Sequence, residues 1–355
     1  MSQSKISWQR IRDSQLFWPL LALALIMLFN LFFTPGFYNI EIKDGHLSGF
    51  LVDIFNRGSI LMLLAIGMTM VIATGGVDLS VGAVVAISAA VATVLINPAL
   101  AEKLISSEEL VKDVTSTPLW ICILAALVAA TACGLWNGLL VSRAKIEPMV
   151  ATLVLMVAGR GIAQLITHGQ IITVYYSRYF FIGNGYLLGI PFSFFIVAFV
   201  YLAVWLLARR TAFGMFVESV GINARSSYLS GINEKNIKLI VYTLSGFCAG
   251  VAGLIYSSNV KSADANNAGL NLELDAILAV VIGGTLMTGG RFSLLASVIG
   301  ALVIQATTTT MYALGVPAMA ASAIKGLVVL IVVLLYSDQT KLVLGKLFER
   351  EGARS

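Results

Sequence analysis

Charged residues are scarce in this chain. Among its 355 residues, lysine, arginine, aspartate and glutamate together account for 12 %, against 58 % hydrophobic residues. Soluble domains carry about a quarter charged residues, interleaved with apolar ones. No polar stretch here is long enough to fold as a separate soluble domain. The composition therefore predicts one transmembrane domain over residues 1–355.

Histidine is nearly missing, and this argues against several enzyme classes. His46 and His168 are the only two, and neither belongs to the His-Glu-x-x-His pattern of zinc hydrolases. No helix carries the paired Asp-x-x-Asp clusters of a metal-dependent lipid transferase. We therefore predict that the chain is not an enzyme and holds no metal.

A nucleotide site is also missing. The phosphate-binding loop needs a glycine, four further residues and then Gly-Lys-Ser/Thr, whereas Gly345-Lys346 is followed by Leu347 and has no glycine at the right distance before it. The chain should bind no cofactor, and ATP, if it drives the function, must be used by a separate polypeptide. The net charge of +5 does not indicate nucleic acid, because the basic residues cluster at the ends of apolar segments. The three cysteines lie inside apolar blocks, which predicts free thiols.

What the chain has instead is a series of apolar blocks of membrane-spanning length. Two of these blocks are separated by little more than a glycine-rich interruption, so eight or nine full crossings are the alternative to ten. The first block runs on to Phe33 with no Ala-x-Ala site after it, which predicts an uncleaved first span rather than a signal peptide. The predicted spans are 16–34, 55–73, 79–96, 119–141, 149–167, 190–208, 238–257, 274–288, 293–313 and 318–336.

Basic residues predict the orientation of these spans. With the amino terminus inside, the cytoplasmic segments contain most of the basic residues, including Arg209 and Arg210, and the opposite segments contain few. This is the direction of the positive-inside rule. An odd number of spans would place the basic carboxyl tail outside. We therefore predict an all-α polytopic membrane protein with ten helices and both termini in the cytoplasm.

Two glycine-rich breaks interrupt the apolar blocks, around residues 74–80 and 282–291. The first contains Asp78, and an ionised carboxylate costs about 2.5–3.5 kcal/mol at the centre of a membrane helix. Broken helices at membrane depth are typical of a substrate route. The alternative is that Asp78 lies just outside the membrane and caps the next helix.

A few polar residues lie inside or at the edge of apolar blocks. Arg160 needs a partner, which can be the carboxylate of Asp78 or Asp275 or a set of backbone carbonyls, and its role can be structural or part of the route. Glu273 and Asp275 suit the amino terminus of the eighth span electrostatically. Lys325, near the start of the tenth span, can extend toward an interface.

The segment between the sixth and seventh spans is the longest internal cytoplasmic connection. Residues 211–233 contain a partial apolar face with Phe216, Val220, Tyr228 and Leu229, and Gly231 is a suitable helix stop. The segment is either an ordinary connection or a surface element on which a soluble partner docks.

Taken together, these segments resemble one family, the membrane permeases of bacterial ABC sugar importers of the ribose, xylose and galactofuranose type. The resemblance extends in order over nearly the whole chain. Residues 262–270 look most like the galactofuranose branch. The matching segments are Gly76-Val77-Asp78-Leu79-Ser80-Val81-Gly82, Trp136-Asn137-Gly138-Leu139-Leu140-Val141, Ala151-Thr152-Leu153, Gly159-Arg160-Gly161, Val220-Gly221-Ile222-Asn223 with Ser230-Gly231-Ile232, and Glu273-Leu274-Asp275-Ala276-Ile277 before Gly283-Gly284-Thr285.

The resemblance implies a permease of the bacterial inner membrane that imports a monosaccharide by alternating access. Its implied partners are a cytoplasmic ABC ATPase, a periplasmic sugar-binding protein, membrane lipid and a second permease chain, identical or paralogous. Galactofuranose and arabinose are both reasonable sugars. A proton-coupled secondary carrier that uses Asp78 is the rival function.

Two sets of site residues follow from the breaks and from the resemblance. An ATPase-docking loop is predicted over about 209–237. The predicted path or gate consists of Gly75, Gly76, Asp78, Ser80, Asn137, Arg160, Asp275, Gly283, Gly284 and Thr285. The predicted docking residues are Gly214, Glu218, Gly221, Asn223, Ser230 and Gly231.

Overall fold

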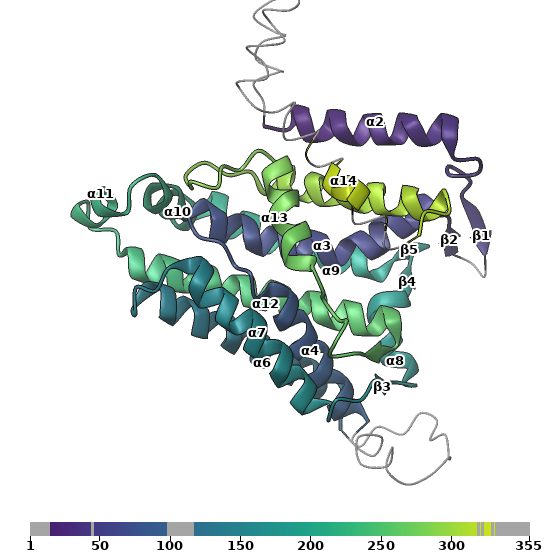
Figure 1. Ribbon diagram of the computed structural model, residues 1–355, viewed down its shortest axis with the longest axis horizontal. Coiled ribbons are helices and arrows are strands. Elements are labelled where there is room, and N and C mark those ends of the chain that lie inside the picture. The colour runs from purple at the N-terminus through teal and green to yellow at the C-terminus, as the bar shows by residue number, and fades with distance from the viewer. Residues whose placement is uncertain are drawn as a thin grey trace, which may run out of the picture.

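The computed structural model describes residues 15–43, 46–97, 117–317, 320, 323–327 and 330. These parts are mainly helical, and the longer helices form a bundle (Figure 1). The longer helices are α2 (Phe17–Phe33), α3 (Phe50–Ala73), α4 (Val81–Ile96), α6 (Leu119–Ser142), α7 (Pro148–Ile166), α9 (Phe192–Arg210), α12 (Glu234–Val260) and α14 (Leu294–Ala313). The shorter ones are α8 (Ser177–Asn184), α10 (Phe213–Ile222), α11 (Ala224–Leu229) and α13 (Leu272–Ile282).

The first nine predicted spans each fall on one of these helices. Six helices are long and apolar enough to cross a membrane, and α2 and α4 are shorter apolar helices. The eighth span was predicted too long, because α13 already ends at Ile282, where two glycines follow. Most of the tenth span and the ends of both termini lie outside the described residues.

Short strands are a small departure from the all-α prediction. They form three antiparallel pairs: β1 (Glu41–Lys43) with β2 (His46–Ser48), β3 (Ile172–Thr173) with β6 (Ser262–Ala263), and β4 (Tyr186–Leu187) with β5 (Ile190–Pro191). These strands and α8 lie at one end of the bundle, on the right of Figure 1, which we call the hairpin end. Helices α10 and α11 lie at the opposite end, which we call the α10 end.

Helix α12 occupies the centre of the bundle and packs along α6, α3 and α4. Small residues allow α6 and α12 to come close. A Cβ atom added at Gly246 would lie 2.6 Å from the carbonyl oxygen of Ala130 and 2.7 Å from the Cα of Gly134. Contacts of this kind are a common way for membrane helices to associate, because apolar side chains gain little by leaving lipid for protein.

The outer surface of the bundle is apolar. Large hydrophobic side chains such as Phe32, Val157, Leu165 and Phe199 are exposed on α2, α7 and α9. Lipid suits such a surface and water does not. The cysteines are free thiols, with Cys122 and Cys248 buried, as predicted.

Candidate functional site: two glycine-rich breaks

The first break joins the end of α3 to the start of α4, and Asp78 lies buried within it. Its Oδ1 accepts hydrogen bonds from the backbone N–H of Ser80 (3.0 Å) and from the Ser80 hydroxyl (2.6 Å). Its Oδ2 accepts one from the hydroxyl of Ser245 on α12 (2.8 Å). Ser245 lies about 16 Å along α12 from its first residue, at 1.5 Å per residue. Asp78 is therefore inside the bundle, not a surface cap.

Ser80 extends this cluster to a third helix. Its hydroxyl oxygen accepts a hydrogen bond from the side-chain amide of Asn137 on α6 (2.8 Å). The structure thus brings together three of the predicted residues, Asp78, Ser80 and Asn137, and adds Ser245. We call these four residues the Asp78 cluster. Its hydrogen bonds satisfy a buried carboxylate with neutral donors from the break and from α12, and Asn137 on α6 supports Ser80 in turn.

The backbone of the first break is held by neighbouring helices as well. Thr152 on α7 accepts a hydrogen bond from the amide of Leu79 (3.1 Å). The Tyr242 hydroxyl on α12 donates to the carbonyl oxygen of Val77 (3.4 Å) and lies against Gly76, where a side chain would overlap it. Backbone groups freed by a helix break need such partners at membrane depth.

The second break follows α13 and contacts the first. The amide of Gly290 donates to the carbonyl oxygen of Ala73, the last residue of α3 (2.9 Å). Gly75 lies against the carbonyl of Thr288, and Gly283 packs against the backbone of Ala296 and Ser297 in α14. The first break and residues 288–290 of the second break therefore form one connected site, whereas Gly283 packs on α14 and Gly284 bonds back to Val281 (2.9 Å).

Helix α10 contacts the ends of both breaks at Gly221. A Cβ atom added at Gly221 would overlap the carbonyl oxygen of Ala73 and the amide nitrogen of Gly290. Gly289 also lies against the carbonyl of Gly221. Two loops and one helix meet at this point with no side chain between them.

Thr285 and Glu273 are among the buried polar residues left unpaired in the described part of the chain, together with Ser142 and with the side-chain oxygens of Asn137 and Asn259. The Thr285 hydroxyl and both carboxylate oxygens of Glu273 have no hydrogen-bond partner among the described residues. The Glu273 carboxylate lies beside Gly82, near the start of α4. Buried groups of this kind are costly and are found at functional sites more often than elsewhere.

Arg160 does not join this site, and neither proposed carboxylate is its partner. It donates hydrogen bonds to the backbone carbonyls of Ala265 and Asn266 (3.3 Å each) and to that of Ala268. These residues belong to segment 264–271, which runs irregularly between β6 and α13. Gly269 of the same segment packs against Gly82 and Val85 of α4, inside the bundle. Arg160 therefore holds the backbone of this segment in place.

Asp275 also lies apart from the Asp78 cluster. Its Oδ2 lies 2.8 Å from the Nζ of Lys325, with both side chains about one-fifth exposed. Lys325 is thus bound to α13, and the expectation that it extends to an interface was wrong. No hydrogen bond or ion pair joins Asp275 to the first break in the described part of the chain.

Comparison with known proteins decides the family. Residues 50–333 match the family model described as branched-chain amino acid transport system / permease component. The galactofuranose transporter permease protein YtfT of Escherichia coli is 46 % identical over 91 % of each chain. The fructose import permease protein FruF of Bifidobacterium longum is 36 % identical over 91 % of this chain and 88 % of that one. The ribose import permease protein RbsC of Haemophilus influenzae is 33 % identical over 89 % and 90 %.

The chain belongs to this permease family. No solved structure matches it. The relatives carry the names of sugar permeases, which is the type that the sequence segments resembled.

The permease's predicted docking loop contains two helices rather than one. Asn223 lies between α10 and α11, and its side chain accepts a hydrogen bond from the amide of Ser226 (2.9 Å), which caps α11. Gly231 follows the end of α11 with φ of +85°, so the predicted helix stop is confirmed. Gly214 packs tightly against the carbonyl of Ala208 at the end of α9.

The apolar face predicted for this loop is divided in two by the structure. Val220 is buried and Phe216 half-buried against the permease core, whereas Tyr228 and Leu229 are exposed. Met215 and Ile222 add to the outward face. We call Met215, Ile222, Tyr228 and Leu229 the outward face of the loop.

Sequence reasoning missed three residues of the site, namely Thr152, Tyr242 and Ser245. Each is a hydroxyl-bearing residue inside an apolar block. Serine and threonine hydroxyls usually bond back to their own helix, and a tyrosine in an apolar block fits an ordinary core position, so residue type did not mark these three as partners of the break. The matching segment Ala151-Thr152-Leu153 was the one available signal, and it pointed to Thr152 alone.

Proposed function

We propose that this permease is the membrane subunit of an ATP-driven importer that carries a monosaccharide into a bacterial cell by alternating access. It lies in the inner membrane with ten crossings and both termini in the cytoplasm. The α10 end then faces the cytoplasm, and the hairpin end faces the periplasm. A separate ABC ATPase, a periplasmic sugar-binding protein and a second permease chain complete the transporter.

The contact of Gly221 with both breaks carries this proposal. An ATPase seated on the outward face of the loop would move α10 and α11. Because Gly221 lies on the backbone of Ala73 and Gly290, such a motion is passed directly to the ends of α3, α13 and α14. The two breaks then open and close the route at the cytoplasmic side. No further subunit or long chain of contacts is needed for this coupling.

The names of the relatives support the substrate class. Galactofuranose, fructose and ribose can all be five-membered rings, and we propose galactofuranose first, with arabinose as a similar alternative. The three neutral hydrogen bonds to Asp78 favour a structural role for this carboxylate over that of a proton carrier. A secondary carrier driven by protons remains the rival to be tested.

The test is uptake of labelled sugars by proteoliposomes that contain this chain, its ATPase and its binding protein. We expect uptake of one furanose-forming sugar that stops when ATP or the binding protein is omitted. Branched-chain amino acids, added because of the family description, should not be taken up. Uptake that persists without ATP and follows an imposed proton gradient would overturn the proposal in favour of the secondary carrier.

A further inference from the structure

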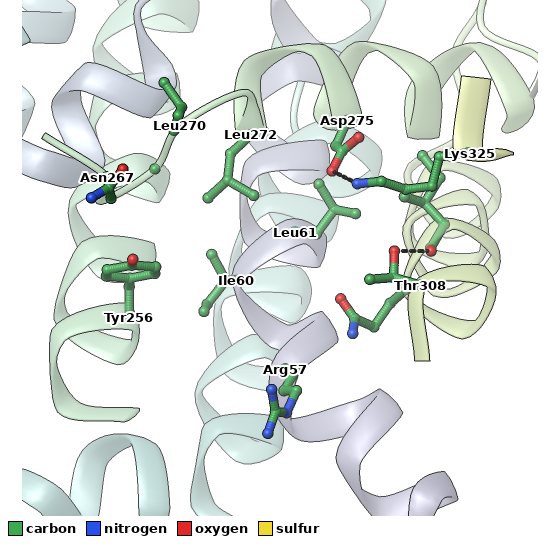
Figure 2. A pocket seen from close by; sticks show the side chains of 13 residues that line it. Arg57, Ile60, Leu61, Tyr256, Asn267, Leu270, Leu272, Asp275, Thr308 and Lys325 are labelled. Carbon is green, nitrogen blue, oxygen red and sulfur yellow. Dashed lines mark hydrogen bonds and ion pairs between the residues drawn. The ribbon is translucent and has the colours of Figure 1, made fainter. Parts of the chain in front are cut away.

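A cavity of about 300 Å³ lies in the bundle, away from the two breaks (Figure 2). Helix α3 forms its back, and α12, α14 and the start of α13 form its sides. Arg57 and Leu61 on its wall lie about 24 and 18 Å along α3 from Ala73, and about 10.5 and 16.5 Å from Phe50, at 1.5 Å per residue. The cavity is therefore nearer the hairpin end, whereas the breaks meet at the α10 end. Its polar lining residues are Tyr256, Asn267, Asp275, Gln305, Thr308 and Lys325, with Arg57 beside them.

The polar lining offers both donors and acceptors of hydrogen bonds. The ion pair of Asp275 and Lys325 lies on one wall (Figure 2) and leaves the second carboxylate oxygen and further ammonium protons for other partners. The Thr308 hydroxyl donates to the carbonyl oxygen of Ile304 (2.9 Å), so its oxygen is left to accept. Gln305 donates to the hydroxyl of Thr309 (3.3 Å), and its own carbonyl oxygen remains for another donor.

The opposite wall suits the C–H face of a small ring. Tyr256 stands there across from the ion pair, with Ile60, Leu61 and Leu272 between them (Figure 2). No hydrogen bond is formed by the Tyr256 hydroxyl within the described residues. An apolar wall with a few converging polar groups is the usual make-up of a small-molecule site, and about 300 Å³ is the lower end of the range for such sites.

The charges favour a neutral ligand. Asp275 neutralises Lys325 at 2.8 Å, and the carboxylate would repel an anion at this wall. Arg57 is exposed, so its charge is largely screened by solvent. A polyhydroxylated neutral ring, which needs donors, acceptors and an apolar face at once, fits this lining best.

We infer that this cavity holds one neutral monosaccharide during transport, with its hydroxyls bound by Asp275, Lys325 and Gln305 and its ring against Tyr256. The inference rests on the proposed function and adds a sugar site at a depth different from that of the gate. The breaks at the α10 end would then release a sugar that is already held nearer the hairpin end.

Cysteine protection in the complete transporter tests the site. In the Thr308→Cys variant, a small hydrophilic thiol reagent should label the cavity, and the transported sugar should slow labelling at least threefold. A sugar that wild-type protein does not transport should have no effect. Ala144→Cys, exposed in the connection between α6 and α7 and outside both the cavity and the docking loop, is the control and should label at the same rate with and without sugar.

Two results would overturn the inference while ATP-driven uptake by wild-type protein is intact. One is sugar-independent labelling of Thr308→Cys, and the other is no labelling at all, because a cavity that admits sugar admits the reagent. If wild-type protein takes up no sugar, the proposed function itself fails. The two failures are therefore distinguishable.

Hydroxyl deletion provides a second test. Thr308→Val keeps the side-chain shape and removes one neutral hydrogen-bonding group, so KM for sugar uptake should rise about 3- to 10-fold with little change in the maximal rate. Thr307→Val is the matched control, because Thr307 is buried, bonds back to Val303 in its own helix (2.8 Å) and does not line the cavity. An equal KM in both variants would contradict the site.

Discussion

The hydroxyl of Ser245 donates a hydrogen bond of 2.8 Å to the Oδ2 of Asp78, although 167 residues separate the two in the chain. This bond ties the first break to the central helix α12. It also gives the buried carboxylate a partner outside its own loop.

Removal of this bond should weaken the fold. Ser245→Ala leaves one oxygen of a buried carboxylate with one donor fewer, which costs about 1–3 kcal/mol. Thermal unfolding in detergent should therefore begin at a lower temperature. The control is Ser297→Ala, a buried serine that bonds only to Ser293 in its own helical turn. Equal unfolding temperatures of the two variants would show that the bond from Ser245 to Asp78 contributes nothing to stability.

The Asp78→Asn variant distinguishes an ATP-driven importer from a proton-coupled secondary carrier. The amide keeps the size of the side chain and can still accept from Ser80, so ATP-driven uptake should fall no more than about tenfold, in line with the loss of a charge-assisted bond. A carrier that moves protons through Asp78 would lose all coupled uptake. The measurement is initial uptake rate per folded protein, with and without a proton gradient.

Gly221→Ala should uncouple the permease. The added methyl group overlaps the backbone of both breaks, so α10 must shift, and we expect at least a tenfold loss of ATP-driven uptake. Gly161→Ala makes the same substitution in α7, where nothing lies within 4 Å of the added atom, and should be neutral. Full uptake by Gly221→Ala would remove the coupling contact from the mechanism.

The outward face of the loop should bind the ATPase. Leu229→Arg places a charge on this apolar face, and we expect the ATPase to be lost from the purified complex. Leu188→Arg is a matched control, because Leu188 is just as exposed but belongs to the hairpin end. Co-purification that is equally strong with both variants would place the ATPase elsewhere.

Arg160 should prove structural. Arg160→Met removes the donor for three backbone carbonyls of segment 264–271, and each carbonyl left without a donor costs about 1–3 kcal/mol if it stays buried. We expect faster proteolysis or hydrogen exchange within 264–271 than in wild type. Gln164→Leu, which removes only one side-chain contact to Asn266, should have a smaller effect. The opposite order would contradict the role given to Arg160.

Hydropathy predicted the helices well because each span is encoded locally. Long apolar blocks determine where α6 or α9 begin and end, and glycines determine where α3 and α13 stop. The same local signals predicted the capped turn at Gly231 and the burial of Asp78 inside a break.

The sequence did not predict contacts between segments that lie far apart in the chain. Lys325 pairs with Asp275 across 50 positions, and only the packing of α13 brings the two together. The partners of Arg160 are backbone carbonyls. Every residue has a carbonyl group, so the sequence cannot indicate which ones bind Arg160. Segment 264–271 connects the seventh and eighth predicted spans, and it packs against α4 because small residues such as Gly269 let it come close.

Segment 264–271 bears on how the substrate preference of such a permease can change. It contributes Asn267 and Leu270 to the cavity wall, yet its backbone is held by the side chains of Arg160 and Asp264 and by turn hydrogen bonds, not by a helical or strand ladder. Residues here can be exchanged, or the loop shortened, without disturbing the close contact of α6 with α12. With the cavity as the inferred sugar site, exchange of Asn267 or Leu270 would alter substrate preference while the contacts of Gly269 with α4 and of Arg160 with the backbone keep the fold.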